Sequence, residues 1–198
     1  SQLDRPAIPQ YIDYFTIDTP TDRSFYIVQT LAPGETLERL LASGWRATEA
    51  EITDIATQIL DILIYLHNLP TPVIHRDLKP SNILRTPEGK IYLVDFGAVG
   101  QTYHNTFMRG STVVGTFGYM APEQFRSQAV PATDLYGLGA TLLNLLTNRS
   151  PADLTQADLQ VKFRDRVQVS ATFAEWLEQM LAPDLADRFD SAQTALKE

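Results

Sequence analysis

The sequence predicts an α+β fold that is mainly α, on three observations. Two aromatic and β-branched segments, residues 11–15 and 25–30, have the composition of strands. Two later segments, residues 48–67 and 131–146, carry apolar side chains at helical spacing. Between these helices, two apolar runs enclose a short segment that is dense in charged and polar side chains. That polar segment is the candidate site, because it must place several charges at one point.

The composition narrows the class of protein. A chain of 198 residues with 44% hydrophobic side chains can bury a core and suits one domain or one large lobe of a domain. It has no cysteine, which excludes a disulfide framework and fits a reducing compartment. Its net charge of -8 argues against a general nucleic-acid binder, which would carry a basic face. No apolar run reaches the roughly 18 residues that span a bilayer, and no signal peptide is recognisable. We therefore expect a cytoplasmic protein with no nucleic-acid partner and no membrane segment in this chain.

The elements before the polar segment can be assigned in order. Residues 1–9 are expected to be extended, and the turn at residues 18–22 joins the two strands into a hairpin with a long loop. Residues 35–42 are expected to form a short helix. Thr48 and Glu51 form a capping box for the next helix, in which each side chain satisfies the other's free amide. The apolar residues of this helix are numerous enough to place it deep in the core: Ile52, Ile55, Ala56, Ile59, Ile62, Leu63 and Leu66.

The second half of the chain is mainly helical. His67 lies near the end of the first long helix, where a contact with the helix dipole or the core explains it better than catalysis. Residues 91–94 have the pattern of a strand, and residues 98–120 that of a long loop, which is usually functional or disordered. The helix at residues 131–146 is apolar nearly all round and therefore buried. Further helices are expected near residues 155–164, 171–181 and 190–198. The abrupt end of the sequence suggests a fragment boundary.

The polar segment begins a series of motifs. It reads His75-Arg76-Asp77-Leu78-Lys79-Pro80-Ser81-Asn82, between the strand-like runs Val73-Ile74 and Ile83-Leu84. Asp95-Phe96-Gly97 begins 13 residues after Asn82, and Gly115-Thr116 and Ala121-Pro122-Glu123 follow. This order and spacing resemble the protein kinases, of which these motifs are the established signature set.

The resemblance implies a fold and a division of the chain. Residues 31–198 would form the helical C-lobe of a kinase, with hinge, catalytic loop and activation segment, and residues 1–30 a β-hairpin remnant of the N-lobe. The family's Gly-rich loop and strand Lys are absent from this sequence. The resemblance thus covers about the last three-quarters of the family's domain. We expect this chain by itself to transfer phosphate negligibly.

The resemblance also implies a role for each residue of the site. Asp77 would be the catalytic carboxylate, and Lys79 would neutralise charge on the transferred phosphate. Asn82 and Asp95 would hold Mg²⁺, which prefers oxygen ligands. Thr116 would bridge Asp77 and Lys79 through its hydroxyl group.

A nucleotide site is implied as well, with ATP as the phosphate donor. Gln29, Leu31 and Ala32 match the connector whose backbone groups bind adenine, and Leu84 matches the floor of the adenine pocket. Glu35 is a candidate contact to the ribose, although a Glu at a helix start also suits the helix dipole.

Other residues match supporting positions of the family. His75 and Phe96 would pack beneath the site. Glu123 and Arg188 would form a buried ion pair, and Asp134 would receive backbone amides of the catalytic loop.

The resemblance favours one branch of the family. Lys79-Pro80-Ser81 and Thr116 resemble serine/threonine kinases, whereas small-molecule phosphotransferases lack this Lys and the Ala-Pro-Glu segment. Tyr136, where many eukaryotic kinases have Trp, and residues 97–100 resemble bacterial, in particular cyanobacterial, enzymes. Arg76 resembles kinases in which this Arg pairs with a phosphate on the activation loop. Thr112 is the candidate phosphorylation site, with Ser111 and Thr106 as alternatives, and an unmodified polar loop is equally compatible.

Two functions remain open at this point. The first is a serine/threonine kinase that uses Mg-ATP and a protein substrate, of which this chain is a fragment. The second is a kinase-like binding or scaffolding module without chemistry. The intact Asp77, Lys79, Asn82 and Asp95 favour the first. The two N-terminal strands are marginal alone, so packing on the helical part or a homodimer through the exposed hairpin is expected to hold them.

Overall fold

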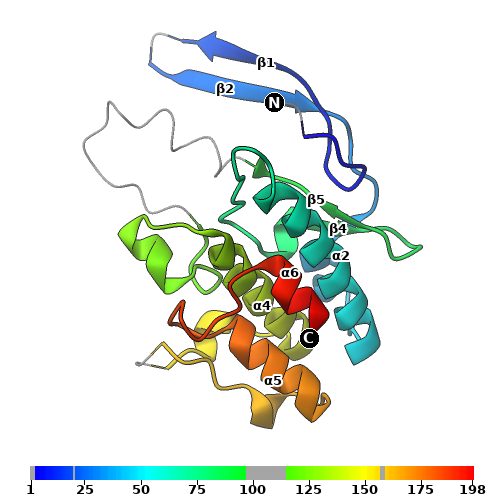
Figure 1. Ribbon diagram of the computed structural model, residues 1–198. Helices are drawn as coiled ribbons and strands as arrows, with labels where there is room; N and C mark the ends of the chain where they lie inside the picture. The colour runs from blue at the N-terminus through cyan, green and yellow to red at the C-terminus, as the bar shows by residue number, and fades with distance from the viewer. Residues whose placement is uncertain (1–2, 20, 97–114, 157–158) are drawn as a thin grey trace.

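The structure is a computed structural model that describes residues 3–19, 21–96, 115–156 and 159–198. A two-stranded hairpin stands apart from a helical body, and a second small sheet lies between them (Figure 1). The predicted α+β class, rich in helices, is confirmed. The sequence interpretations for residues 97–100, Thr106, Ser111 and Thr112 lie outside the described residues.

The predicted hairpin is present. Strands β1 (Tyr11–Asp18) and β2 (Arg23–Gln29) pair antiparallel, and each extends beyond the aromatic segment that predicted it. The rings of Phe15 and Tyr26 stack with centroids 4.9 Å apart across the pair. The hairpin nevertheless leaves apolar side chains exposed on both faces, because two strands cannot cover each other; the side chain of Phe25 is 71% exposed.

The second sheet has the order β3-β4-β5, with β3 (Glu35–Thr36), β4 (Ile83–Arg85) and β5 (Ile91–Leu93). The predicted strand at residues 91–94 is therefore confirmed. The helix expected from residue 35 begins later, as α1 (Leu37–Ala42), because Glu35 and Thr36 pair with β4 and the Thr36 hydroxyl caps the helix.

The apolar run before the polar segment, Val73-Ile74, forms no strand. The interpretation of this run as strand-like was wrong, because the backbone amides that follow it, those of His75 and Arg76, donate to Asp134 of helix α4 (Pro131–Thr147). Immediately after the polar residues, the chain makes one turn of 3-10 helix, η1 (Pro80–Asn82), and then enters β4.

The long helix α2 (Glu49–His67) is the centre of the body. Its capping box is present: the Thr48 hydroxyl accepts from the Glu51 amide, and the Glu51 side chain accepts from the Thr48 amide. All the apolar residues that predicted a deep position are buried. Helix α2 packs against both α4 and α6.

The other long helix, α4 (Pro131–Thr147), is buried on nearly every side, as predicted. It ends where Asn148 adopts the left-handed conformation, with φ 52°. Helices α5 (Ala171–Met180) and α6 (Ala192–Lys197) match their predicted positions, and α5 packs against α4. No helix in the described part of the chain has the length and apolar character needed to cross a membrane.

The helix expected near residues 155–164 is wrong. Two short 3-10 helices, η5 (Pro151–Asp153) and η6 (Arg164–Arg166), flank this stretch, and Thr155 forms a β-bridge with Val161. The physical reason is that, of the residues described between 155 and 164, Phe163 is the one that is deeply buried, at 1% exposure, so they form no apolar helix face.

The segment before the hairpin belongs to the core of the helical body. Ile8 is buried, and the Leu93 amide donates to the Ala7 carbonyl at 3.0 Å. The Asp4 amide donates to the Tyr65 hydroxyl on α2 at 2.9 Å. The segment that precedes the hairpin is therefore anchored to the helical body, and the hairpin extends from this anchored segment.

Candidate active site

The polar segment is an irregular loop whose backbone is held by the first turn of α4. Asp134 is 1% exposed, and its carboxylate accepts from the backbone amides of His75, at 2.9 Å, and Arg76, at 2.8 Å. The His67 ring lies 2.9 Å from the same carboxylate. A buried carboxylate needs such partners, since an unpaired charge in the interior is costly. His67 thus contacts the core at the end of α2, and the structure gives it no place in the candidate site.

Two residues of the candidate site have left-handed backbones, the neighbour of Asp77 and Asp95 itself. Arg76 has φ 70° and Asp95 has φ 63°, a region that non-glycine residues enter rarely. Such a conformation costs about 1–3 kcal/mol and persists where the surroundings over-determine it, which is common at functional sites.

Four of the five predicted catalytic residues meet at the carboxylate of Asp77. The Lys79 ammonium lies 2.8 Å from one oxygen, and the Thr116 hydroxyl donates to the other at 2.8 Å. Lys79 also donates to the Thr116 oxygen at 2.7 Å, which closes a triangle. The Asn82 amide nitrogen donates to the backbone carbonyl of Asp77 at 2.9 Å and to its carboxylate at 3.2 Å. Thr116 arrives from a different part of the chain, so tertiary structure assembles this cluster.

Asn82 and Asp95 are brought close through the backbone. The Val94 amide donates to the Asn82 carbonyl at 3.0 Å, and Asp95 is the next residue, with an exposed side chain. The Asn82 amide nitrogen donates to Asp77, and its side-chain oxygen, which has only a long contact of 3.4 Å with the Ser81 hydroxyl, keeps a lone pair for a ligand. An amide oxygen and a carboxylate are the hard donors that Mg²⁺ takes, usually beside substrate phosphates. Among the described residues, no group of three or more His, Asp or Glu could hold a metal ion by itself.

The predicted nucleotide contacts lie on two neighbouring segments. Leu31 and Ala32 line one side of a small pocket, together with Tyr92 of β5 and residues between 5 and 10. Tyr92 pairs with Leu84 on β4, the predicted adenine floor, but Leu84 itself does not line this pocket. The Leu31 side chain is 96% exposed.

The other two predicted contacts lie at strand termini. Gln29 ends β2 and is exposed, and Glu35 on β3 is exposed opposite Arg85.

The predicted supports of the loop are in place. The fully buried His75 ring makes an edge contact with Phe96, with ring centroids 5.0 Å apart. One of its nitrogens lies 3.1 Å from the Val94 carbonyl and the other 3.4 Å from the Asp77 amide. This pattern suits a neutral ring protonated at Nε2, which links the two sides of the site.

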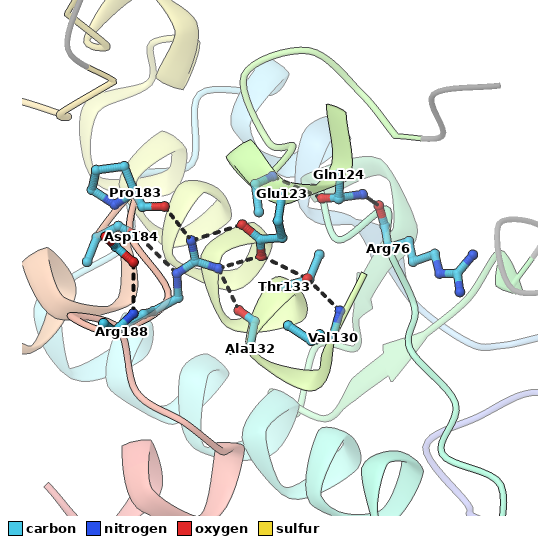
Figure 2. A network of polar contacts seen from close by, with 12 residues as sticks. Arg76, Glu123, Gln124, Val130, Ala132, Thr133, Pro183, Asp184 and Arg188 are labelled. Atoms are coloured by element: carbon cyan, nitrogen blue, oxygen red, sulfur yellow. Dashed lines mark hydrogen bonds and ion pairs between the residues drawn. The ribbon is translucent and has the colours of Figure 1, made fainter. Parts of the chain in front are cut away.

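The Ala-Pro-Glu segment forms the 3-10 helix η4 (Pro122–Arg126), and its Glu123 forms the predicted ion pair with Arg188 (Figure 2). Nη1 and Nη2 of Arg188 lie 2.8 and 3.3 Å from the two carboxylate oxygens. Arg188 also donates to the carbonyls of Ala132, Ala182 and Pro183. The guanidinium lies 5.1 Å from the centre of the Tyr136 ring. Burial raises the pKa of that phenol, although the positive charge of Arg188 opposes the shift.

Sequence reasoning missed Gln124. Its side chain lies between the Ala121 amide and the Arg76 carbonyl, so it joins η4 to the polar loop (Figure 2). Only its position directly after Ala-Pro-Glu could have drawn attention to it, since its contacts depend on the folding of a distant loop.

Comparison with known proteins gives the same assignment. The model of the protein kinase domain matches residues 1–198. Serine/threonine-protein kinase F of Synechocystis sp. is 39% identical over 200 residues, which cover 96% of this chain and 40% of that protein. Serine/threonine-protein kinase B of Synechocystis sp. and serine/threonine-protein kinase PknA of Nostoc sp. are each 34% identical, again over 96% of this chain.

These relatives are longer proteins, of which this chain spans 34 to 40%. The predicted likeness to cyanobacterial serine/threonine kinases is confirmed by their names and identities. With a family model matched from the first residue to the last, and with the Asp77 cluster assembled as that family's motifs imply, the chain belongs to the protein kinase family.

Proposed function

We propose that the full-length gene product transfers the γ-phosphoryl group of ATP to a serine or threonine hydroxyl of a protein. The observation that carries this proposal is the Asp77 carboxylate, which has an ammonium group and a hydroxyl group at 2.8 Å on its two oxygens. A module that only binds partners has no physical need to hold these groups together, because each must be desolvated and aligned.

The roles follow from the chemistry of phosphoryl transfer. The substrate hydroxyl oxygen forms a bond to the γ-phosphorus, the bond to the bridging oxygen of ADP breaks, and Asp77 receives the hydroxyl proton. Lys79 offsets the negative charge of the transferred group. Thr116 holds both side chains at the angle seen here, since its oxygen accepts from Lys79 while its hydrogen goes to Asp77.

Asn82 and Asp95 are proposed to hold Mg²⁺, which would neutralise charge on the phosphates. The fit rests on their oxygen donors and on the use of the Asn82 amide nitrogen elsewhere. Gln29, Leu31, Ala32, Glu35 and Leu84 are proposed to contact the adenosine part of ATP. The pocket lined by Leu31 and Ala32 supports this assignment for the connector.

Two further properties of the gene product are proposed, its location and its contacts. The absence of cysteine from this sequence supports a cytoplasmic location. The apolar side chains exposed on both faces of the β1-β2 hairpin support contacts through this hairpin, with a second copy of the chain as one occupant.

The test is phosphate transfer from Mg-ATP to a generic basic protein by the full-length gene product. Asp77→Asn keeps the size of the side chain and removes the proton acceptor, so the rate should fall by about 10²–10⁴-fold. Asp165→Asn is the matched control, because that side chain is 74% exposed. Equal rates for wild type and Asp77→Asn would contradict the proposal. No transfer by the wild type would favour the binding module.

A further inference from the structure

The peptide that joins Arg76 and Asp77 has to be held in place. The backbone of Arg76 lies in the left-handed region, with φ 70°, and neighbouring contacts must offset the strain of this conformation. Asp134 holds the amide of Arg76 at 2.8 Å. The carbonyl of Arg76 accepts from the side-chain nitrogen of Gln124, also at 2.8 Å. Arg76 is thus held at its amide by Asp134 of α4 and at its carbonyl by Gln124 of η4, and Figure 2 shows the second of these contacts.

The Gln124 amide has only one orientation that suits both the Ala121 amide and the Arg76 carbonyl. Its oxygen accepts from the Ala121 amide at 2.9 Å, and its nitrogen donates to Arg76. A flipped amide would place a donor against a donor and an acceptor against an acceptor. The side chain is 5% exposed, so water cannot readily replace either contact. Gln124 is therefore a rigid link between the Ala-Pro-Glu segment and the loop that carries Asp77.

The contact acts on the peptide plane next to the catalytic carboxylate. The Arg76 carbonyl and the Asp77 amide belong to the same planar peptide group. At the amide end, the contact with the His75 ring is long, at 3.4 Å. The Gln124 contact is therefore the stronger restraint on that plane, and rotation of the plane would turn the Cα–Cβ bond of Asp77.

A glycine makes room for this contact. Gly115 has φ 135°, and a Cβ atom there would lie 2.6 Å from the Met120 side chain and 3.2 Å from both the Arg76 carbonyl oxygen and the Gln124 side-chain nitrogen. The backbone that leads to Thr116 therefore passes directly against the Gln124–Arg76 hydrogen bond. The Asp77 carboxylate is held by Thr116, and the peptide before Asp77 is held by Gln124. Because Gly115 lies against the second contact and directly precedes Thr116, the two contacts are coupled.

We propose that Gln124 is a positioning residue, which sets the direction of the Asp77 carboxylate by fixing the Arg76–Asp77 peptide. The proposal rests on the proposed kinase function. It predicts that loss of the side-chain donor lowers the rate of the chemical step more than it lowers nucleotide affinity or stability.

The test uses Gln124→Glu in the full-length gene product, with transfer from Mg-ATP to a basic protein as the assay. The ionised carboxylate can still accept from Ala121, but it turns an oxygen toward the Arg76 carbonyl. The protonated acid restores the donor. Burial raises the pKa of the introduced carboxyl above its ordinary value of about 4.3. We therefore expect kcat to fall roughly ten- to hundredfold near pH 8 and to recover toward wild type as the pH is lowered to about 6.

Two comparisons separate positioning from a general loss of structure. Gln128→Glu is the matched control, because it makes the same change on an exposed side chain four positions away. Gln124→Met, which has neither donor nor acceptor, should stay slow across the whole pH range. Both Gln124 variants should keep the KM for ATP within about twofold and remain folded at the assay temperature, as a melting curve would show.

Each outcome decides one of the two proposals. An active wild type with Gln124→Glu indistinguishable from Gln128→Glu at every pH would overturn the role of Gln124 alone. A lowered melting temperature with unchanged kcat would do the same, because the side chain would then be only structural. A wild type without transfer would overturn the kinase function, and the role of Gln124 with it.

Discussion

Replacement of Arg188 by methionine tests how much the Glu123–Arg188 pair contributes to the fold. The guanidinium side chain is fully buried, and it satisfies both oxygens of a carboxylate that is itself 7% exposed. Arg188→Met leaves that carboxylate with the hydrogen bond from the Thr133 hydroxyl, at 2.8 Å, in the network of Figure 2. It also removes the donor from three backbone carbonyls.

The expected cost follows from this geometry. Removal of one partner of a buried ion pair costs about 3–5 kcal/mol, because the other charge stays buried without compensation. The stability of a domain is only about 5–15 kcal/mol, so the loss should be a large part of the total. Arg164→Met is the control, since its pair with Glu178 is 48% and 45% exposed and should contribute about 0–1 kcal/mol.

The assay is urea unfolding followed by tryptophan fluorescence. Trp176 is a suitable probe, because its ring lies 6.3 Å from that of Phe189, next to Arg188 in the chain. A loss of less than about 1 kcal/mol in Arg188→Met, or a loss equal to that of Arg164→Met, would refute the reasoning. The double variant Glu123→Gln with Arg188→Met should be less destabilised than the sum of the single changes, since it strands no charge.

Two further changes probe the site and the capping box. Thr116→Val removes hydrogen bonds to two charged groups, so kcat at saturating Mg-ATP should fall about 10–100-fold. Thr116→Ser keeps the hydroxyl group and should therefore keep most of kcat. Equal rates for the two variants would contradict the bridging role. The hydrogen bond from the Thr48 amide lowers the pKa of Glu51 in the folded protein below its ordinary 4.5. The ionised Glu51 side chain therefore contributes fully to stability above pH 4.5, and this contribution is lost as the pH falls through the lower pKa of the folded state. Glu51→Gln retains an acceptor for the cap, so the fall in the urea midpoint between about pH 7 and about pH 3 should be smaller than in wild type, and an identical fall would exclude this contribution.

Local patterns predicted the regular elements well. The capping box and the buried face of α2 follow from side chains only three or four residues apart, and such contacts exist in any isolated helix. The helix expected near residues 155–164 was wrong, because Phe163, the one deeply buried side chain among the residues described there, packs into the core without a helix face around it. The start of α1 shifted for a similar reason, since Glu35 and Thr36 pair with a strand some fifty residues away in sequence.

The motifs, their order and the family they imply could be read from the amino-acid sequence, because they depend on residue identity and spacing along the chain. It also supplied the chemistry of Asp77, Lys79 and Asn82, which lie within one short loop. Tertiary structure alone decided that the Thr116 hydroxyl meets Asp77 and that Gln124 reaches the Arg76 carbonyl. Those contacts join segments nearly forty or more residues apart, and their geometry depends on how η4 and α4 pack against the loop. No local pattern encodes that packing, because it comes from the burial of the whole core.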